Sequence, residues 1–207
     1  MISSIYIHEP ENSPCGVVIG ITGRNTTLGS MFDLIANAGL NRSVLVVIQP
    51  KNLEWYPAPN GPGDQKNAIN GLNNNVKHLV NRIKSIQSMY GFDKNLVSLI
   101  GYSAGAVMAL KVIECSEYNF AGVVALSGVV LDPVSLRPAS NNTPLLLKHS
   151  FDDECFEWEE RYVPSRDALI ARGYNVTVEE KQDGGHGVTL ADIHAAGRFL
   201  RPKLGYR

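Results

Sequence analysis

The sequence has few cysteines, no long apolar run and no excess of one charge, and each absence excludes a class of protein. Cys15, Cys115 and Cys155 are odd in number and widely spaced, so they predict neither a disulfide framework nor a metal site. No apolar run reaches the roughly 18 residues needed to cross a bilayer. Residues 1–9 lack the basic and apolar segments of a signal peptide, so we expect a cytoplasmic location.

Lysine and arginine together number 19, and aspartate and glutamate number 20, which gives a formal net charge of -1. This balance argues against nucleic acid or an anionic membrane surface as a partner. The 207 residues, 44% of them hydrophobic, suffice for the core of one α/β domain. We therefore expect a single domain over residues 1–207. The sequence leaves open whether the chain forms a homodimer.

Apolar runs typical of buried strands alternate with segments of helical periodicity. The expected strands are 15–21, 43–48, 95–100, 121–126, 144–149 and 175–180, the last alternating as an edge strand does. The expected helices are 27–37 (capped by Asn25 or Thr26), 69–90, 104–114, 159–172 and 189–200, and a loop rich in Pro and Gly spans 49–63. This alternation predicts a mostly parallel sheet with helices on both faces and a ligand site at the carboxyl ends of the strands.

The expected strand 95–100 leads directly into Gly-Tyr-Ser-Ala-Gly at 101–105, and a helix-forming stretch follows. A G-x-S-x-G pattern between a strand and a helix is typical of a sharp turn that lifts the serine hydroxyl above the sheet edge. Gly101 and Gly105 leave room for the crossing of strand and helix. The pattern therefore predicts Ser103 as a nucleophile.

A serine hydroxyl needs a base to remove its proton, and the base needs an acid to orient it. In the fold that carries this turn, the order along the chain is serine, acid, histidine. His186 lies between two glycines on the loop after the last expected strand, so we expect it to be the base. His194 falls within the last helix and His149 ends a strand, positions that favour structural roles. His8 and His78 are expected at the surface.

The acid is expected after the fifth expected strand, where Asp152, Asp153 and Glu154 follow one another. Neighbouring loop residues point in different directions, so one of the three should face the base, and spacing alone does not choose among them. Asp183 is a weaker candidate, because it lies on the same loop as the histidine and an aspartate there commonly caps its own turn.

Two backbone N–H groups are expected to stabilise an oxyanion. One belongs to Ala104, at a helix N-terminus, where free N–H groups and the helix dipole favour negative charge. The other should come from the loop after the first expected strand, where Arg24 is the candidate. The side chain of Arg24 fits either a solvated surface position or anion binding at the mouth of the site.

Four segments together resemble one family, the phospholipase/carboxylesterase group of α/β-hydrolases, over roughly residues 15 to 200. They are Gly101-Tyr102-Ser103-Ala104-Gly105-Ala106, Trp55-Tyr56-Pro57, His149-Ser150-Phe151-Asp152-Asp153 and Gly184-Gly185-His186-Gly187. The group includes acyl-protein thioesterases and small bacterial carboxylesterases. The resemblance implies an α/β-hydrolase fold with a mostly parallel central sheet, helices on both faces and little or no lid.

Carried over position by position, the resemblance makes Ser103 the nucleophile, Asp153 the acid and His186 the base. It also implies that Trp55 and Tyr56 belong to a substrate-binding loop. The implied activity is hydrolysis of a small-molecule carboxylic ester or thioester through an acyl-enzyme, with no metal or organic cofactor. A non-catalytic binding protein of the same fold and a serine hydrolase of small amides or lactones are the alternatives.

The chain departs from the family pattern at three positions. Thr22 stands where histidine is usual, Ala104 where a glutamine commonly follows the nucleophile, and Ser150 where glycine is common. These changes leave the backbone N–H donors in place, so they bear on substrate preference.

Overall fold

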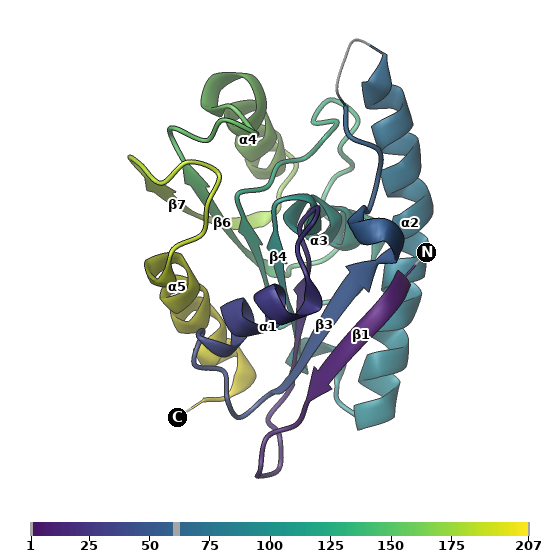
Figure 1. Ribbon diagram of the computed structural model, residues 1–207, viewed down its shortest axis with the longest axis vertical. Helices are drawn as coiled ribbons and strands as arrows, with labels where there is room; N and C mark the ends of the chain where they lie inside the picture. The colour runs from purple at the N-terminus through teal and green to yellow at the C-terminus, as the bar shows by residue number, and fades with distance from the viewer. Residues whose placement is uncertain (1, 60–62, 207) are drawn as a thin grey trace.

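A seven-stranded sheet forms the centre of the computed structural model, which describes residues 2–59 and 63–206 (Figure 1). Its strands are β1 (Ile2–His8), β2 (Val17–Ile21), β3 (Val44–Pro50), β4 (Val97–Tyr102), β5 (Gly122–Leu126), β6 (Pro144–Ser150) and β7 (Asn175–Lys181). Their order across the sheet is β1-β3-β2-β4-β5-β6-β7. β1 pairs antiparallel with β3, and the other pairings are parallel, which confirms the predicted sheet.

Helices cover both faces of the sheet, as predicted. They are α1 (Leu28–Ala36), α2 (Asp64–Tyr90), α3 (Ala104–Cys115), α4 (Val163–Ala171) and α5 (Leu190–Leu200). Side chains of α1 and α5 pack on one face, and those of α2, α3 and α4 pack on the other (Figure 1). Within the described ranges, no helix combines the length and the hydrophobicity that a membrane crossing requires.

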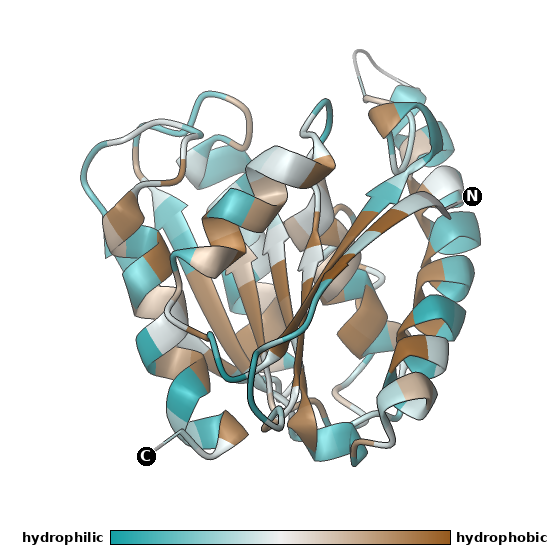
Figure 2. Cartoon of the chain, turned by 60° about the horizontal axis from the view of Figure 1, so that its bottom comes forward, coloured by the Kyte–Doolittle hydropathy of each residue, from teal (hydrophilic) through white to brown (hydrophobic). Residues whose placement is uncertain are grey.

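The central strands are buried on both faces. Every residue of β2 and β3 is buried, because helices cover them from both sides. Leu79 of α2 and Val112 of α3 are fully buried in one layer, and Ile35 of α1 and Leu200 of α5 are fully buried in the other. Figure 2 shows hydrophobic strands between helices whose outward faces are hydrophilic. Burial of this apolar area is the main favourable contribution to folding.

Two features at the N-terminal side differ from the sequence prediction. The apolar pattern does not predict β1, because this edge strand exposes Tyr6, Ile7 and His8 and so lacks a continuous buried run. The cap of α1 is Thr27, whose side chain accepts a hydrogen bond from the N–H of Ser30 (3.1 Å). The predicted caps, Asn25 and Thr26, are therefore wrong by one or two positions.

The predicted helix 159–172 is divided into two parts. A π-helical turn, η3 (Trp158–Tyr162), precedes α4, and Pro164 lies in the first turn of α4, a position where proline is common. Single π-turns are rare and are often found at functional sites. Residues 60–62 of the predicted loop 49–63 lie outside the described residues.

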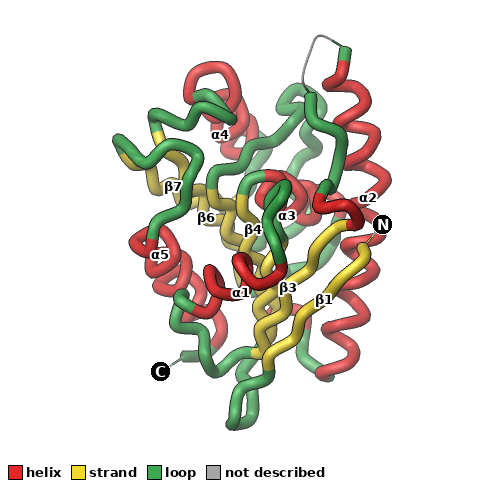
Figure 3. The backbone as a smooth tube through the Cα atoms, in the orientation of Figure 1, coloured by secondary structure: helices red, strands yellow, loops and turns green. Residues whose placement is uncertain are grey.

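The loops that follow the parallel strands gather at one edge of the sheet (Figure 3). Since β2 to β7 run in the same direction, their carboxyl ends lie at the same edge, and each strand is followed there by a loop. Side chains far apart in the sequence are thereby brought within reach of one another, as expected for a ligand site in such a sheet.

The turn between β4 and α3 leaves no room for a side chain at either of its glycines. A Cβ atom at Gly105 would meet the carbonyl oxygens of Ile21 and Thr22, the latter at 2.6 Å. A Cβ atom at Gly101 would lie 2.6 Å from the Cα atom of Ala106. The close approach of α3 to β2 and β4 therefore requires glycine at both positions.

We expect Gly105→Ala to lower the free energy of unfolding by about 2–3 kcal/mol, because overpacking against backbone atoms has costs of this size. Gly29→Ala in α1 is the matched control, since Gly29 is exposed and the nearest atom to an added Cβ is 3.9 Å away. It should keep or raise stability by up to about 1 kcal/mol. Urea unfolding followed by circular dichroism measures both, and an unchanged Gly105→Ala midpoint would contradict the tight crossing.

Candidate active site

Ser103 lies on the turn between β4 and α3 in a strained backbone conformation. Its φ of 53° and ψ of -121° fall outside the regions that L-residues favour. Its N–H donates to the carbonyl oxygen of Leu126 at the end of β5 (2.9 Å), which ties the turn to the neighbouring strand. Strain that the surrounding structure holds in this way is typical of functional sites.

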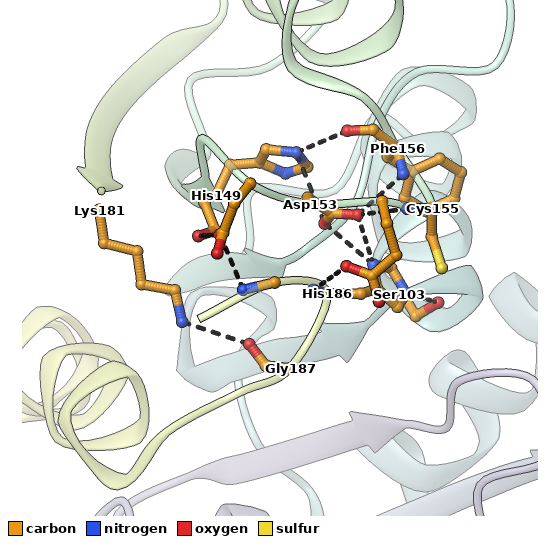
Figure 4. Close-up of polar contacts among 12 residues, drawn as sticks. Ser103, His149, Asp153, Cys155, Phe156, Lys181, His186 and Gly187 are labelled. Carbon is orange, nitrogen blue, oxygen red and sulfur yellow. Dashed lines mark hydrogen bonds and ion pairs between the residues drawn. The ribbon is translucent and has the colours of Figure 1, made fainter. Parts of the chain in front are cut away.

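The ring of His186 bridges Ser103 and Asp153 (Figure 4). Its Nε2 atom lies 2.7 Å from the Ser103 hydroxyl oxygen, and its Nδ1 atom lies 2.9 and 3.0 Å from the two carboxylate oxygens of Asp153. An ionised carboxylate can only accept hydrogen bonds, so Nδ1 carries the proton and Nε2 accepts from the serine hydroxyl. The three side chains that the resemblance selects thus form one hydrogen-bonded chain.

The carboxylate of Asp153 is fully buried, and several hydrogen-bond donors contact it. Its side chain is 0% exposed. Besides the His186 ring, the backbone N–H groups of Cys155 and Phe156 donate to its Oδ1 atom at 2.9 and 2.8 Å. Burial raises the pKa of a carboxyl group, but these hydrogen bonds outweigh that effect and hold the pKa of Asp153 below its usual value. Asp153 is therefore ionised at neutral pH.

Asp152 and Glu154, the two neighbouring candidates for the acid, bind the backbone of the histidine loop instead of the ring. Asp152 accepts the N–H groups of the two glycines before the histidine (3.2 and 2.8 Å) and the hydroxyl of Ser150 (2.5 Å). Glu154 accepts the N–H of His186 itself (3.1 Å). Asp183 is exposed and makes no hydrogen bond to the ring. The geometry therefore separates one carboxylate at the ring from two at the loop backbone.

The same loop is also held from its other side. The Tyr102 hydroxyl donates to the carbonyl oxygen of His186, and the Lys181 ammonium donates to that of Gly187, both at 3.3 Å. Lys181 in turn pairs with the carboxylate of Asp192 in α5 (2.9 Å). Although the loop is rich in glycine, contacts from β4, β7 and the β6–α4 connection fix its backbone.

His149 is a buried structural histidine behind the acid, as its position in the sequence predicts. Its Nε2 atom lies 2.8 Å from the carbonyl oxygen of Phe156, and its ring stacks on that of Tyr162 with centroids 4.2 Å apart. Its Nδ1 atom has no hydrogen-bond partner among the described residues. Burial lowers the pKa of His149, so the ring is neutral at neutral pH.

A cleft of about 480 Å³ opens beside the serine. Its walls come from the loops after all six parallel strands, and the lining residues are Arg24, Asn25, Tyr56, Ala58, Pro59, Tyr102, Ser103, Ala104, Leu131, Cys155, Phe156, Arg161 and His186. This volume lies within the range of small-molecule sites.

The two residues expected to supply oxyanion donors, Arg24 and Ala104, both line the cleft with Ser103. Ala104 is the first residue of α3, and N–H groups at this position have no partner within the helix. The Arg24 side chain pairs with Glu54 (2.7 Å) and donates to the carbonyl oxygen of Tyr56 (3.0 Å). These contacts tie the side chain to the loop after β3, whereas the sequence left open a solvated surface position or anion binding.

Trp55 does not line the cleft, contrary to the substrate contact that the resemblance implies. The residue is 1% exposed, and its Nε1–H donates to the carbonyl oxygen of Thr22 (2.7 Å). It therefore anchors the loop after β3 to the end of β2. Tyr56, the next residue, does line the cleft. Of the aromatic pair, Trp55 therefore packs in the interior, whereas Tyr56, although only 4% exposed, reaches the cleft wall.

One cluster of side chains has the composition of a metal site. Ligand atoms of Asp153, Cys155 and His186 all lie within 4.8 Å of one another. Both ring nitrogens of His186 already have partners, Asp153 and Ser103. A metal ion at the cluster would have to displace one of them, so these residues do not fit a resident cofactor.

Sequence reasoning missed several residues of the cleft wall, among them Cys155, Phe156 and Arg161. The first two follow the acid directly, so their proximity could have been inferred from the chain. Arg161 falls where a regular helix is expected, and arginines on helices are most often solvated. The π-helical turn that presents it has no sequence signal of its own.

Comparison with known proteins finds a family and a curated relative that resemble the chain in sequence. The family profile described as phospholipase/carboxylesterase matches residues 30–203. Esterase YpfH of Escherichia coli (strain K12) is 27% identical over 154 residues, which are 73% of this chain and 63% of that protein. The chain thus spans less than two thirds of the length of this curated relative.

Solved structures resemble the whole fold at low sequence identity. That of esterase PE8 has a TM-score of 0.85 at 19% identity and covers 97% of this chain and 98% of its own. That of the Bacillus cereus carboxylesterase has a TM-score of 0.78 at 18% identity and covers 98% and 95%. The topology and these similarities define an α/β-hydrolase fold. Because the family profile covers most of the sequence, the chain belongs to the phospholipase/carboxylesterase family.

The buried ring of His149 should make stability depend on pH. A histidine whose pKa is lowered by folding binds more protons when unfolded, so its contribution is complete above the ordinary pKa of 6.5 and is lost as pH falls. We expect the free energy of unfolding to fall by up to about 1.4 kcal/mol per pH unit between pH 6.5 and 5 from this group alone.

His149→Gln keeps a donor for the Phe156 carbonyl but does not titrate, so the difference between wild type and this variant isolates the effect. Urea unfolding at pH 7.5, 6.5 and 5.5 measures it. If the free energy of unfolding changed with pH in the same way for both proteins across this range, the lowered pKa of His149 would be contradicted.

Proposed function

We propose that the protein is a serine hydrolase that cleaves carboxylic esters, or thioesters, through Ser103, His186 and Asp153. The single observation that carries the proposal is the hydrogen-bonded chain from the Ser103 hydroxyl through the His186 ring to the Asp153 carboxylate, with distances of 2.7 and 2.9 Å. Membership of the phospholipase/carboxylesterase family supports the ester bond as the target.

The first half of the reaction forms an acyl-enzyme. Nε2 of His186 takes the hydroxyl proton as Oγ of Ser103 attacks the acyl carbonyl carbon. Asp153 remains ionised and stabilises the imidazolium ring through Nδ1–H. Collapse of the tetrahedral intermediate breaks the bond to the leaving group, and the proton on Nε2 passes to the departing alcohol or thiol.

The second half returns the enzyme to its starting state. Nε2 of His186 removes a proton from water, and the resulting hydroxide attacks the acyl carbon. The bond to Ser103 then breaks, its oxygen regains the proton from His186, and the carboxylic acid leaves. In both halves the N–H groups of Ala104 and Arg24 are the proposed donors to the oxyanion, a contribution worth about 3–4 kcal/mol per donor in comparable sites.

We expect Ser103→Ala to lower kcat/KM for short p-nitrophenyl esters by at least about 10⁴-fold, since the attacking oxygen is removed. Ser135→Ala, at an exposed serine outside the cleft, is the matched control and should retain full activity. Esters from acetate to laurate test activity and acyl length together, and the open cleft favours the shorter ones. Full activity of Ser103→Ala would remove the proposal.

The two rival readings give different outcomes in companion assays. A non-catalytic binding protein would hydrolyse no ester and would fail to react with a fluorophosphonate serine probe. An amidase or lactonase would react with the probe but turn over amides or lactones in preference to esters and thioesters.

The roles of adjacent aspartates can be separated by isosteric changes. Asp153→Asn should lower kcat by about 10³–10⁴-fold, because an amide at Nδ1 favours the wrong ring tautomer. Asp152→Asn keeps one carbonyl oxygen for the loop N–H groups and should lower kcat by less than about tenfold, as a positioning residue would. Steady-state kinetics on both variants tests the assignment, and a larger loss in Asp152→Asn would reverse it.

A further inference from the structure

The cleft beside Ser103 carries an unbalanced charge. Among its described lining residues, Arg24 and Arg161 are cationic, and none is an aspartate or glutamate. The side chain of Asp153 has no exposed surface. The N-terminus of α3, at Ala104 in the cleft wall, adds partial positive charge. The walls therefore favour a ligand with a negative group.

The two arginines differ in whether their charge is already paired. Arg24 forms an ion pair with Glu54 at 2.7 Å. For Arg161, no carboxylate oxygen of the described residues lies within 4 Å of the guanidinium nitrogens. The exposed glutamates of its own turn do not line the cleft. Arg161 thus presents an uncompensated charge at the wall of the site.

The backbone that carries Arg161 is held on both sides by stacked rings. Arg161 belongs to η3, whose first residue, Trp158, stacks on Phe151 with centroids 3.7 Å apart. Its last residue, Tyr162, stacks on His149 with centroids 4.2 Å apart. A cation on a fixed backbone loses less conformational freedom on binding than one on a mobile loop.

We propose that Arg161 binds a carboxylate group of the substrate, so that the enzyme selects esters whose acyl or alcohol part carries a carboxylate. The inference rests on the proposed ester hydrolysis at Ser103. A guanidinium group pairs with a carboxylate through two parallel N–H···O bonds, which fixes orientation as well as charge. Since Arg161 and Ser103 line the same cleft, one small substrate can contact both.

The test compares charged esters with uncharged esters of the same shape. Monoethyl succinate, with its carboxylate on the acyl side, is paired with ethyl 4-methylpentanoate. Acetoxyacetate, with its carboxylate on the alcohol side, is paired with isobutyl acetate. A pH-stat measures hydrolysis of each ester by wild type, Arg161→Gln and Arg161→Lys.

We expect Arg161→Gln to lower kcat/KM by about 10- to 100-fold for at least one charged ester, the size of effect that a charge-assisted hydrogen bond has, and by less than threefold for its uncharged partner. The pair of esters in which the charged member loses activity identifies which side of the ester carries the carboxylate. Arg161→Lys should restore part of the loss, because it keeps the charge without the planar fork. Arg198→Gln removes an exposed charge on α5, outside the cleft, and should change neither ester.

Equal effects of Arg161→Gln on the charged and uncharged esters of both pairs would overturn the inference while leaving ester hydrolysis in place. If wild type hydrolyses neither these four esters nor the p-nitrophenyl esters, the proposed function fails, and calorimetric titration with succinate still tests Arg161. Weaker succinate binding by Arg161→Gln than by wild type and Arg198→Gln supports the carboxylate site. Identical or undetectable binding in all three proteins overturns it.

Discussion

The placement of the His186 ring is the constraint on which the site depends. The ring can accept the Ser103 proton only while Asp153 holds Nδ1 and the loop backbone keeps Nε2 within hydrogen-bond distance. The loop that carries the ring is rich in glycine. Its order comes from N–H groups that donate to Asp152 and Glu154. Three successive carboxylates after β6 therefore act together, one on the ring and two on the backbone that carries it.

The site also requires that its three side chains, which are far apart in the sequence, lie close together, and the sheet brings them together. Ser103 follows β4, Asp153 follows β6 and His186 follows β7, and these strands are parallel, so their carboxyl ends share one edge. The strained turn at Ser103 is maintained because α3 approaches β2 too closely for a side chain at Gly105. Packing in the interior thus determines geometry at the rim.

The sequence predicts the parts of the molecule that depend on local patterns. Buried strands, helices with an apolar stripe and the strand–turn–helix context of Ser103 follow from periodicity and from one motif. The rest depends on tertiary contacts. The cap at Thr27, the burial of Trp55 and the π-turn that presents Arg161 are set by neighbours distant in the chain. Spacing narrowed the acid to three adjacent residues and the resemblance selected Asp153, but only the fold shows that the other two carboxylates bind the loop backbone.

Trapping the covalent intermediate tests the central claim most directly. Protein mixed with p-nitrophenyl acetate, quenched in acid within milliseconds and digested, should carry one acetyl group on the peptide that contains Ser103. Release of p-nitrophenol in a burst of about one equivalent should accompany it. An acetyl group on Cys155, whose sulfur lies within 4.8 Å of ligand atoms of Asp153 and His186, would contradict the account, as would steady turnover without any acylated peptide.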